Sequence, residues 1–153
     1  YPQFGGNYQV IHHTQLIADL IRSGKLKLGR LNGQKITYHD SCYLGRYNDI
    51  YDEPREILEA INEMNVELAQ SRSRSFCCGG GGGHMWMEED PDKRVNIRRV
   101  EQVQEAKVDI VATACPYCLT MFEDGLKAKE LEESVKARDI SELVASLLLD
   151  GHE

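Results

Sequence analysis

Residues 108–118 read Val-Asp-Ile-Val-Ala-Thr-Ala-Cys-Pro-Tyr-Cys and contain a strand, a junction and the start of a helix. The apolar run from Val108 to Ala112 has the length of a strand, and its character predicts a buried position in a parallel sheet. Pro116 is favoured in the first turn of a helix, so a helix is expected directly after Cys115. The stretch therefore predicts a strand–helix unit with a cysteine at the junction.

The same order recurs along the chain. Apolar residues from Ile11 to Ile21 share one face of a helix that Gly24 ends. Further helices are expected at about 54–62 and 93–106, from 116 onward, and after Asp139, which has the glutamate of a capping box three residues on. Strands are expected at 35–38, 66–69, 108–112 and, more weakly, 134–137. This alternation predicts an α/β fold with a mainly parallel sheet of about four strands flanked by helices.

The composition indicates one globular domain. The chain has 153 residues, of which 41% are hydrophobic and 28% charged, enough for a core without disulfide support. The net charge of −7 disfavours a nucleic-acid partner, because such binding depends on basic residues. No signal peptide is expected, and the given sequence has no apolar run of the roughly 18 residues that a membrane span requires. Since the first residue is Tyr1 rather than Met, we expect a piece of a longer protein.

Five cysteines are present, and an odd number leaves at least one thiol without a disulfide partner. They are also grouped: Cys77 adjoins Cys78, and Cys115 precedes Cys118 by three residues. This grouping favours a metal centre in a reducing cytosol over structural disulfides.

The predicted topology brings these cysteines together. Cys42 follows the first strand, Cys77 and Cys78 follow the second, and Cys115 follows the third. Loops after parallel strands emerge at the same edge of the sheet, where open α/β sheets bind ligands. We therefore expect all five thiols on loops at the carboxyl edge.

Cys115 and Cys118 lie at a helix N-terminus, whose partial positive charge stabilises thiolates. Taken alone, Cys-Pro-Tyr-Cys is also compatible with a redox dithiol or with half of a zinc site. A tetrahedral zinc site uses four ligands, whereas an iron–sulfur cluster has several metal atoms to which five thiols could bind. These alternatives stay open at this point.

The five glycines from Gly79 to Gly83 allow the backbone to approach an inorganic group closely and to direct N–H groups at sulfur. A phosphate-binding loop would need Lys followed by Ser or Thr after the glycines. His84 and Met85 stand there instead, which disfavours a phosphate site.

The order of one Cys, then Cys-Cys-Gly, then Cys-x-x-Cys resembles the cysteine-rich "CCG" domain of the heterodisulfide reductases and related iron–sulfur oxidoreductases. The resemblance covers about residues 35–125 and includes every cysteine of the pattern. It implies a [4Fe–4S] cluster, cubane or noncubane, with zinc as a possible substitute. The implied ligands are Cys42, Cys77, Cys78, Cys115 and Cys118.

Residues 76–89, from Phe76 through Cys-Cys and the glycines to Glu89, resemble the C-terminal domain of oxidoreductases associated with electron-transferring flavoprotein and acyl-CoA dehydrogenases. This implies a single cysteine-rich domain over residues 1–153, in the cytoplasm or at the cytoplasmic face of a membrane. Its implied partners are ferredoxin-like domains and a possible membrane segment of the same chain, flavoproteins and quinone-linked carriers. Such a domain would relay electrons and would not be active alone.

Several residues are expected around the cluster without binding it: His39, Gly79, Gly80, His84 and Pro116. His39 could donate a hydrogen bond to cluster sulfur, and His84 could do the same or relay a proton, although an ordinary loop position is the favoured interpretation for both. His12 and His13 are expected at the surface or as caps. Trp86, with Met85 and Met87, is expected to cover the cluster, to form a docking patch or to pack in the core.

Three functions remain after these observations. The first is an iron–sulfur electron-transfer domain, whose heterodisulfide variant would act directly on substrate sulfur. The second is a structural zinc module without redox activity. The third is a thiol–disulfide enzyme that uses Cys115 and Cys118.

Overall fold

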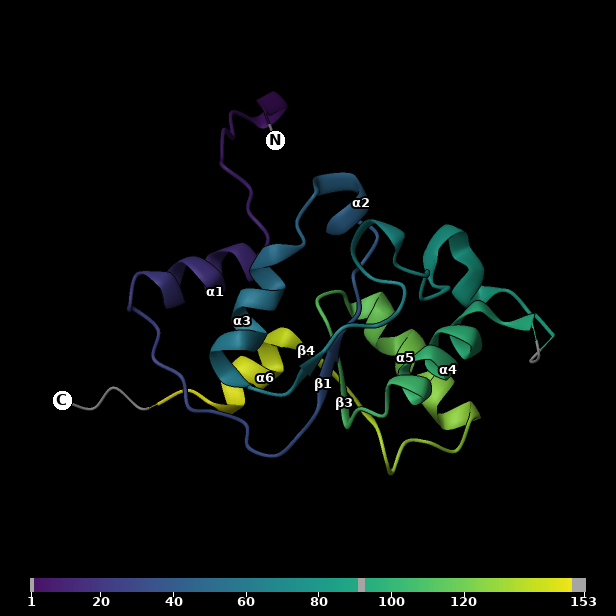
Figure 1. Ribbon diagram of the computed structural model, residues 1–153. Coiled ribbons are helices and arrows are strands. Elements are labelled where there is room, and N and C mark those ends of the chain that lie inside the picture. Colours follow the sequence, from purple (N-terminus) through teal and green to yellow (C-terminus); the bar gives the residue numbers. More distant parts are fainter. Residues whose placement is uncertain (1, 91–92, 150–153) are drawn as a thin grey trace.

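One four-stranded sheet forms the centre of the computed structural model, which describes residues 2–90 and 93–149 (Figure 1). Its strands are β1 (Ile36–Tyr38), β2 (Asn65–Val66), β3 (Ile110–Thr113) and β4 (Lys136–Asp139). They run in the order β2-β1-β3-β4, and every neighbouring pair is parallel. The predicted α/β fold with a parallel sheet is confirmed.

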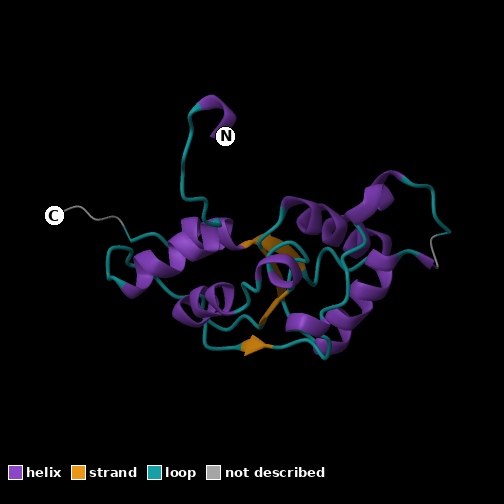
Figure 2. Ribbon diagram, turned by 90° about the horizontal axis from the view of Figure 1, so that it is seen from above, coloured by secondary structure: helices purple, strands orange, loops and turns teal. Residues whose placement is uncertain are grey.

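Helices cover both faces of the sheet (Figures 1 and 2). On one face lie α1 (His13–Arg22), α3 (Asp52–Ile61) and α6 (Ile140–Ser146), and on the other lie α4 (Val95–Ala106) and α5 (Pro116–Ala128). Each face has its own apolar cluster, centred on Ile36, Ile57 and Ile140 on the first and on Val100, Val111 and Phe122 on the second. Burial on both sides explains why β1 and β3 contain almost no exposed residue.

Some element boundaries differ from the sequence prediction. Strand β2 pairs only at Asn65 and Val66, and Glu67, which follows it, binds the guanidinium of Arg55 through its carboxylate. Strand β4 continues to Asp139, which then caps α6 with the predicted capping box.

Four short elements were not predicted. They are α2 (Gly45–Asn48) and the 3₁₀ helices η1 (Pro2–Phe4), η2 (Arg72–Arg74) and η3 (Gly81–Trp86). Helix α2 depends on a glycine, since a Cβ at position 45 would lie 2.5 Å from Cε1 of Tyr51. None of the helices described within residues 2–90 and 93–149 has the length and hydropathy to cross a membrane.

A buried ion pair fixes the loop after β1. The side chain of Asp40 is 2% exposed and accepts hydrogen bonds from two nitrogens of Arg55 on α3, at 2.8 and 3.0 Å. It also accepts one from the backbone N–H of Arg72, at 2.7 Å. Asp40 thereby connects the first cysteine loop to the second.

Replacing Asp40 by Ala should lower the free energy of unfolding by about 3–5 kcal/mol, because it leaves the buried Arg55 without its enclosed partner. Glu67 also binds Arg55, but its side chain is 53% exposed, so Glu67→Gln should cost about 1 kcal/mol or less. Urea denaturation of the metal-free protein compares the two. Equal losses would show that the burial of Asp40 confers no special stability.

Candidate metal centre

The first cysteine lies in the segment His39-Asp40-Ser41-Cys42 that leaves β1. The first three of these residues are buried, at 1%, 5% and 2% exposure, and Cys42 is partly exposed. The Oγ of Ser41 has no hydrogen-bond partner among the described residues. The segment thus presents one thiol and one unused hydroxyl at the carboxyl edge of the sheet.

The second loop carries Cys77 and Cys78, of which Cys78 is buried. Gly79 follows with a φ of +88°, and its N–H donates to the Sγ of Cys77 at 3.3 Å. A Cβ at Gly79 would lie 3.1 Å from Cβ of Val95 and 3.2 Å from the backbone nitrogen of Asn96. Glycine is therefore required here both by conformation and by space.

The third loop places Cys115 as the N-cap of α5 and Cys118 in its first turn. Hydrogen bonding from the Cys118 thiol, followed by the backbone N–H groups of Cys118 and Tyr117, lowers the pKa of Cys115 to about 6. Pro116 occupies the first helical position, as predicted. The helix N-terminus therefore favours a thiolate at Cys115.

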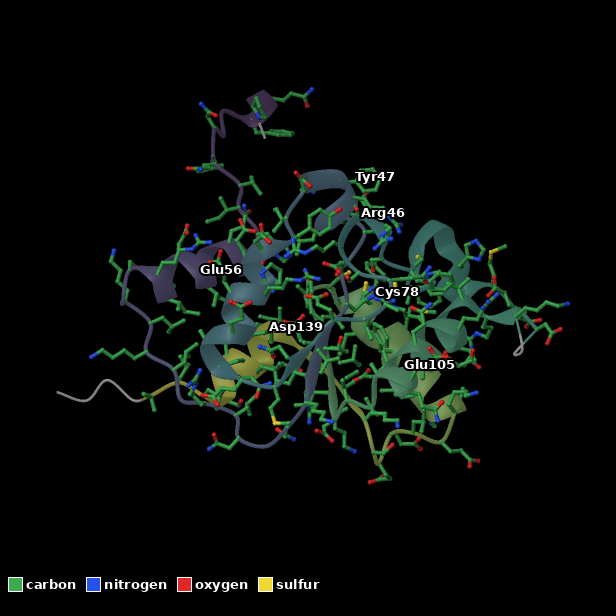
Figure 3. The ribbon with its side chains drawn as sticks, viewed as in Figure 1. Arg46, Tyr47, Glu56, Cys78, Glu105 and Asp139 are labelled. Atoms are coloured by element: carbon green, nitrogen blue, oxygen red, sulfur yellow. The ribbon has the colours of Figure 1, made fainter. Side chains whose placement is uncertain are left out.

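The three loops converge on one cavity at the carboxyl edge. Four of the cysteines, namely Cys42, Cys78, Cys115 and Cys118, line this cavity of about 310 Å³. Cys77 is joined to them by a hydrogen bond to Cys78 and by electrostatic interaction with Cys42. Figure 3 shows Cys78 near the middle of the view, below Arg46 and Tyr47 of α2. All five cysteines are free and gathered in one place.

The sulfurs share protons in a network centred on Cys78. Hydrogen bonds from Cys118, from Cys77 and from His39 lower the pKa of Cys78 far below its ordinary value, and the N–H of Gly80 adds to them. The pKa values of Cys118 and Cys77 are raised, first by their hydrogen bonds to neighbouring cysteines and then by burial. Without metal, the site thus favours thiolates at Cys78 and Cys115 and protonated thiols at Cys77 and Cys118.

His39 is 1% exposed, and its ring lies beside Cys78 and Cys118, with one ligand atom of each residue within 4.8 Å of the others. The Nε of Arg99 donates to its Nδ1 at 3.2 Å. Because a guanidinium can only donate, Nδ1 must accept, and the proton of the neutral ring is on Nε2. Burial lowers the pKa of His39 and keeps the ring neutral. His39 is therefore a hydrogen-bond donor toward the sulfurs rather than a metal ligand.

Arg99 on α4 is 0% exposed, and the sequence interpretation overlooked it. Burial, opposed by the charges of Asp40 and the cysteines, lowers its pKa to about 10, which leaves it charged at neutral pH. The signal was present: Arg99 stands next to Val100 and four residues before Val103, within a buried stripe. A charged residue in such a stripe requires a partner in the interior.

The outer rim of the cavity is aromatic. Trp86, Tyr43 and Tyr117 line it and are 82%, 72% and 59% exposed. The ring of Tyr43 stacks on that of Tyr47, with centroids 5.0 Å apart. The alternative that Trp86 packs in the core is wrong, because its side chain is exposed.

The other histidines have different surroundings. The Nδ1 of His84 lies 2.8 Å from a carboxylate oxygen of Glu89, and its half-exposed side chain does not line the cavity. The expected place of His84 beside the cluster is therefore not supported by the geometry. His12 is the N-cap of α1 and completes a capping box with Gln15, in agreement with the capping role expected for it.

A family model described as "Cysteine-rich domain" (CCG) matches residues 36–123, more than half of the chain. The chain belongs to the CCG family. The matched range contains β1 to β3 and all five cysteines of this CCG domain.

Characterised and inferred oxidoreductases contain similar CCG domains. The chain is 50% identical over 150 residues to a probable iron–sulfur-binding oxidoreductase, FadF, of Bacillus subtilis, covering 97% of this chain and 21% of that protein. It is 46% identical to the EtfAB:quinone oxidoreductase of Syntrophomonas wolfei, covering 94% and 21%. It is 38% identical to one component of the dihydromethanophenazine:CoB–CoM heterodisulfide reductase of Methanosarcina barkeri, covering 92% and 34%. The chain thus spans about a fifth to a third of these relatives.

Substitution of Gly79 by Ala should destabilise the domain by about 1–3 kcal/mol, because it adds a side chain at positive φ against the backbone of α4. Gly81→Ala is the matched control, since its φ is not positive and a Cβ there would meet nothing within 4 Å. Thermal unfolding of both variants measures the difference. A Gly79→Ala protein as stable as Gly81→Ala would show that the loop adapts freely.

Proposed function

We propose that this CCG domain binds one [4Fe–4S] cluster and transfers electrons within a larger iron–sulfur oxidoreductase. The proposed ligands are Cys42, Cys77, Cys78, Cys115 and Cys118. The observation that carries the proposal is the convergence of four free thiols, from three separate loops, on one cavity, with the free thiol of Cys77 next to Cys78.

The chemistry of the donor set fits such a cluster. The described residues that line the cavity include four cysteines and no carboxylate, so the ligands offered are soft sulfurs, which iron–sulfur clusters use. The N–H of Gly79 already donates to one sulfur, and Ser41 has a hydroxyl to spare. When bound, the cluster supplies one-electron oxidation and reduction.

A zinc module is the less favoured alternative. Besides Cys78 and Cys118, the tight group of possible ligands contains only His39. A histidine that binds zinc presents an unprotonated nitrogen to the metal and donates its other N–H to an acceptor. Arg99 forces the opposite arrangement in His39, so this group lacks a usable third ligand.

The aromatic rim suits electron exchange with a partner. Trp86 and Tyr117 are exposed and also line the cavity that holds the sulfurs. A protein or domain that docks on them would come close to the cluster without unfolding any element. Large exposed aromatic residues of this kind are typical of interaction surfaces.

The identity of the partners follows from the relatives only by analogy. We propose that the domain operates beside other domains of a longer protein, on the cytoplasmic side, and relays electrons between a flavoprotein and a quinone-linked acceptor. The name of one relative, the EtfAB:quinone oxidoreductase, supports this choice, and the name of FadF supports an iron–sulfur oxidoreductase. A heterodisulfide-type reaction is the second candidate, supported by the similarity to the heterodisulfide reductase component and by the open cavity next to the sulfurs.

Protein reconstituted without oxygen should contain about four irons and comparable sulfide per chain, with brown absorbance that is lost on reduction. Cys42→Ser should reduce bound iron as severely as Cys118→Ser, because both thiols line the cavity. Thr120→Ala, an exposed substitution on α5, is the control for iron that is lost during purification and reconstitution.

Iron analysis, visible spectra and EPR supply the measurements. One tight zinc and no iron after reconstitution would refute the cluster. A Cys42→Ser protein that binds as much iron as the wild type would refute the assignment of five cysteine ligands, but not the cluster itself. The EPR shape distinguishes a cubane from a noncubane centre.

A further inference from the structure

We infer that Arg99 is the buried counter-cation of the cluster and, through His39, positions a hydrogen bond on the sulfur of Cys78. This inference rests on the proposed function. It assigns Arg99 a role in setting the reduction potential rather than in binding iron.

The hydrogen-bond partners of Arg99 are all uncharged. Besides Nδ1 of His39, its nitrogens donate to the carbonyl oxygen of Gln70 at 3.0 Å, Oε1 of Gln102 at 2.5 Å and Oγ of Ser75 at 3.3 Å. These contacts satisfy its N–H groups but do not neutralise its charge. A fully buried cation is costly unless a negative charge lies near it.

No carboxylate in residues 2–90 and 93–149 forms an ion pair with Arg99. The acidic group that acts on it most strongly is Asp40, and both oxygens of Asp40 are already bound by Arg55. The other groups that attract Arg99 are the cysteines of the metal site, Cys78 first among them. Arg99 is therefore the buried cation that faces the metal site, and Asp40 and the cysteines together balance its charge.

His39 connects Arg99 to that site. Arg99 holds Nδ1 as an acceptor, so Nε2–H is the donor available to the Cys78 sulfur that lies beside the ring. Edge-on contact with Phe122, at 5.0 Å between ring centroids, keeps the ring from turning. The path from guanidinium to imidazole to sulfur is buried along its whole length.

Reduction adds an electron to a cluster that already carries thiolate charge. A nearby buried cation and a hydrogen bond to a ligand sulfur both favour the reduced form. The interaction is strong because little water is present to screen it. Arg99 should therefore raise the reduction potential.

Arg99→Gln tests the charge, and Arg98→Gln is its matched control. Both remove one arginine charge from α4, but Arg98 is exposed and screened by solvent. In redox titrations of the reconstituted chain, followed by EPR, Arg99→Gln should disfavour reduction by at least tenfold, a shift of about 59 mV for one electron. Arg98→Gln should leave the potential within a few-fold of the wild type.

Gln102→Glu tests the same idea without emptying a buried position. It places a carboxylate where Arg99 already donates at 2.5 Å and so neutralises the guanidinium in place. The exposed Gln70 amide, which now accepts from Gln102 at 2.8 Å, can rotate to donate instead. Gln104→Glu, an exposed change on the same helix, adds an equal charge as the control.

The inference is upheld if Gln102→Glu lowers the potential and Gln104→Glu does not, even where Arg99→Gln fails to fold. Equal potentials in cluster-loaded wild type and Gln102→Glu would overturn it and leave the proposed function intact. A wild-type chain that takes up no cluster would overturn the proposed function and this inference with it.

Discussion

The metal centre of this domain depends on three parallel strands whose carboxyl ends lie at the same edge of the sheet. Cys42, Cys78 and Cys115 are far apart in the chain, and only the parallel order β2-β1-β3 brings their loops together. Carboxyl ends of parallel strands form such a meeting place in open α/β sheets generally. A parallel sheet needs helices on both faces to stay buried. Two apolar clusters, one on each face of the sheet, meet this requirement here.

Those two layers act on the site through the adjacent residues His39 and Asp40. Successive side chains of an extended segment point to opposite faces, so His39 meets Arg99 on α4 while Asp40 meets Arg55 on α3. Both arginines are buried, yet their surroundings differ. Arg55 is matched by two carboxylates and stabilises the fold. Arg99 has uncharged partners and faces the sulfurs, which makes its charge available to whatever the sulfurs bind.

The fold and the meeting of the cysteines could be predicted from the sequence, because apolar periodicity and the strand-then-cysteine order are local signals. The contribution of Arg99 could not be predicted in the same way, since three of its four hydrogen-bond partners, His39, Gln70 and Ser75, lie 24 to 60 positions away. His84 illustrates the converse case. It follows the glycines in sequence, two of which, Gly82 and Gly83, have positive φ. Its half-exposed ring contacts the carboxylate of Glu89. Proximity along the chain is a weak guide where glycines set the path.

Thiolates that lie close together repel one another, and groups of the same fold compensate for this repulsion. Hydrogen bonds to neighbouring cysteines, then burial and like charge, raise the pKa of Cys77 and Cys118, so these thiols hold protons that a metal must displace. Three groups stabilise negative charge on the sulfurs. They are the first turn of α5 beside Cys115, the N–H of Gly79 and the buried guanidinium of Arg99. None of them depends on the overall charge of the chain, which is −7. A protein with an acidic surface can thus maintain a locally positive interior where thiolates are needed.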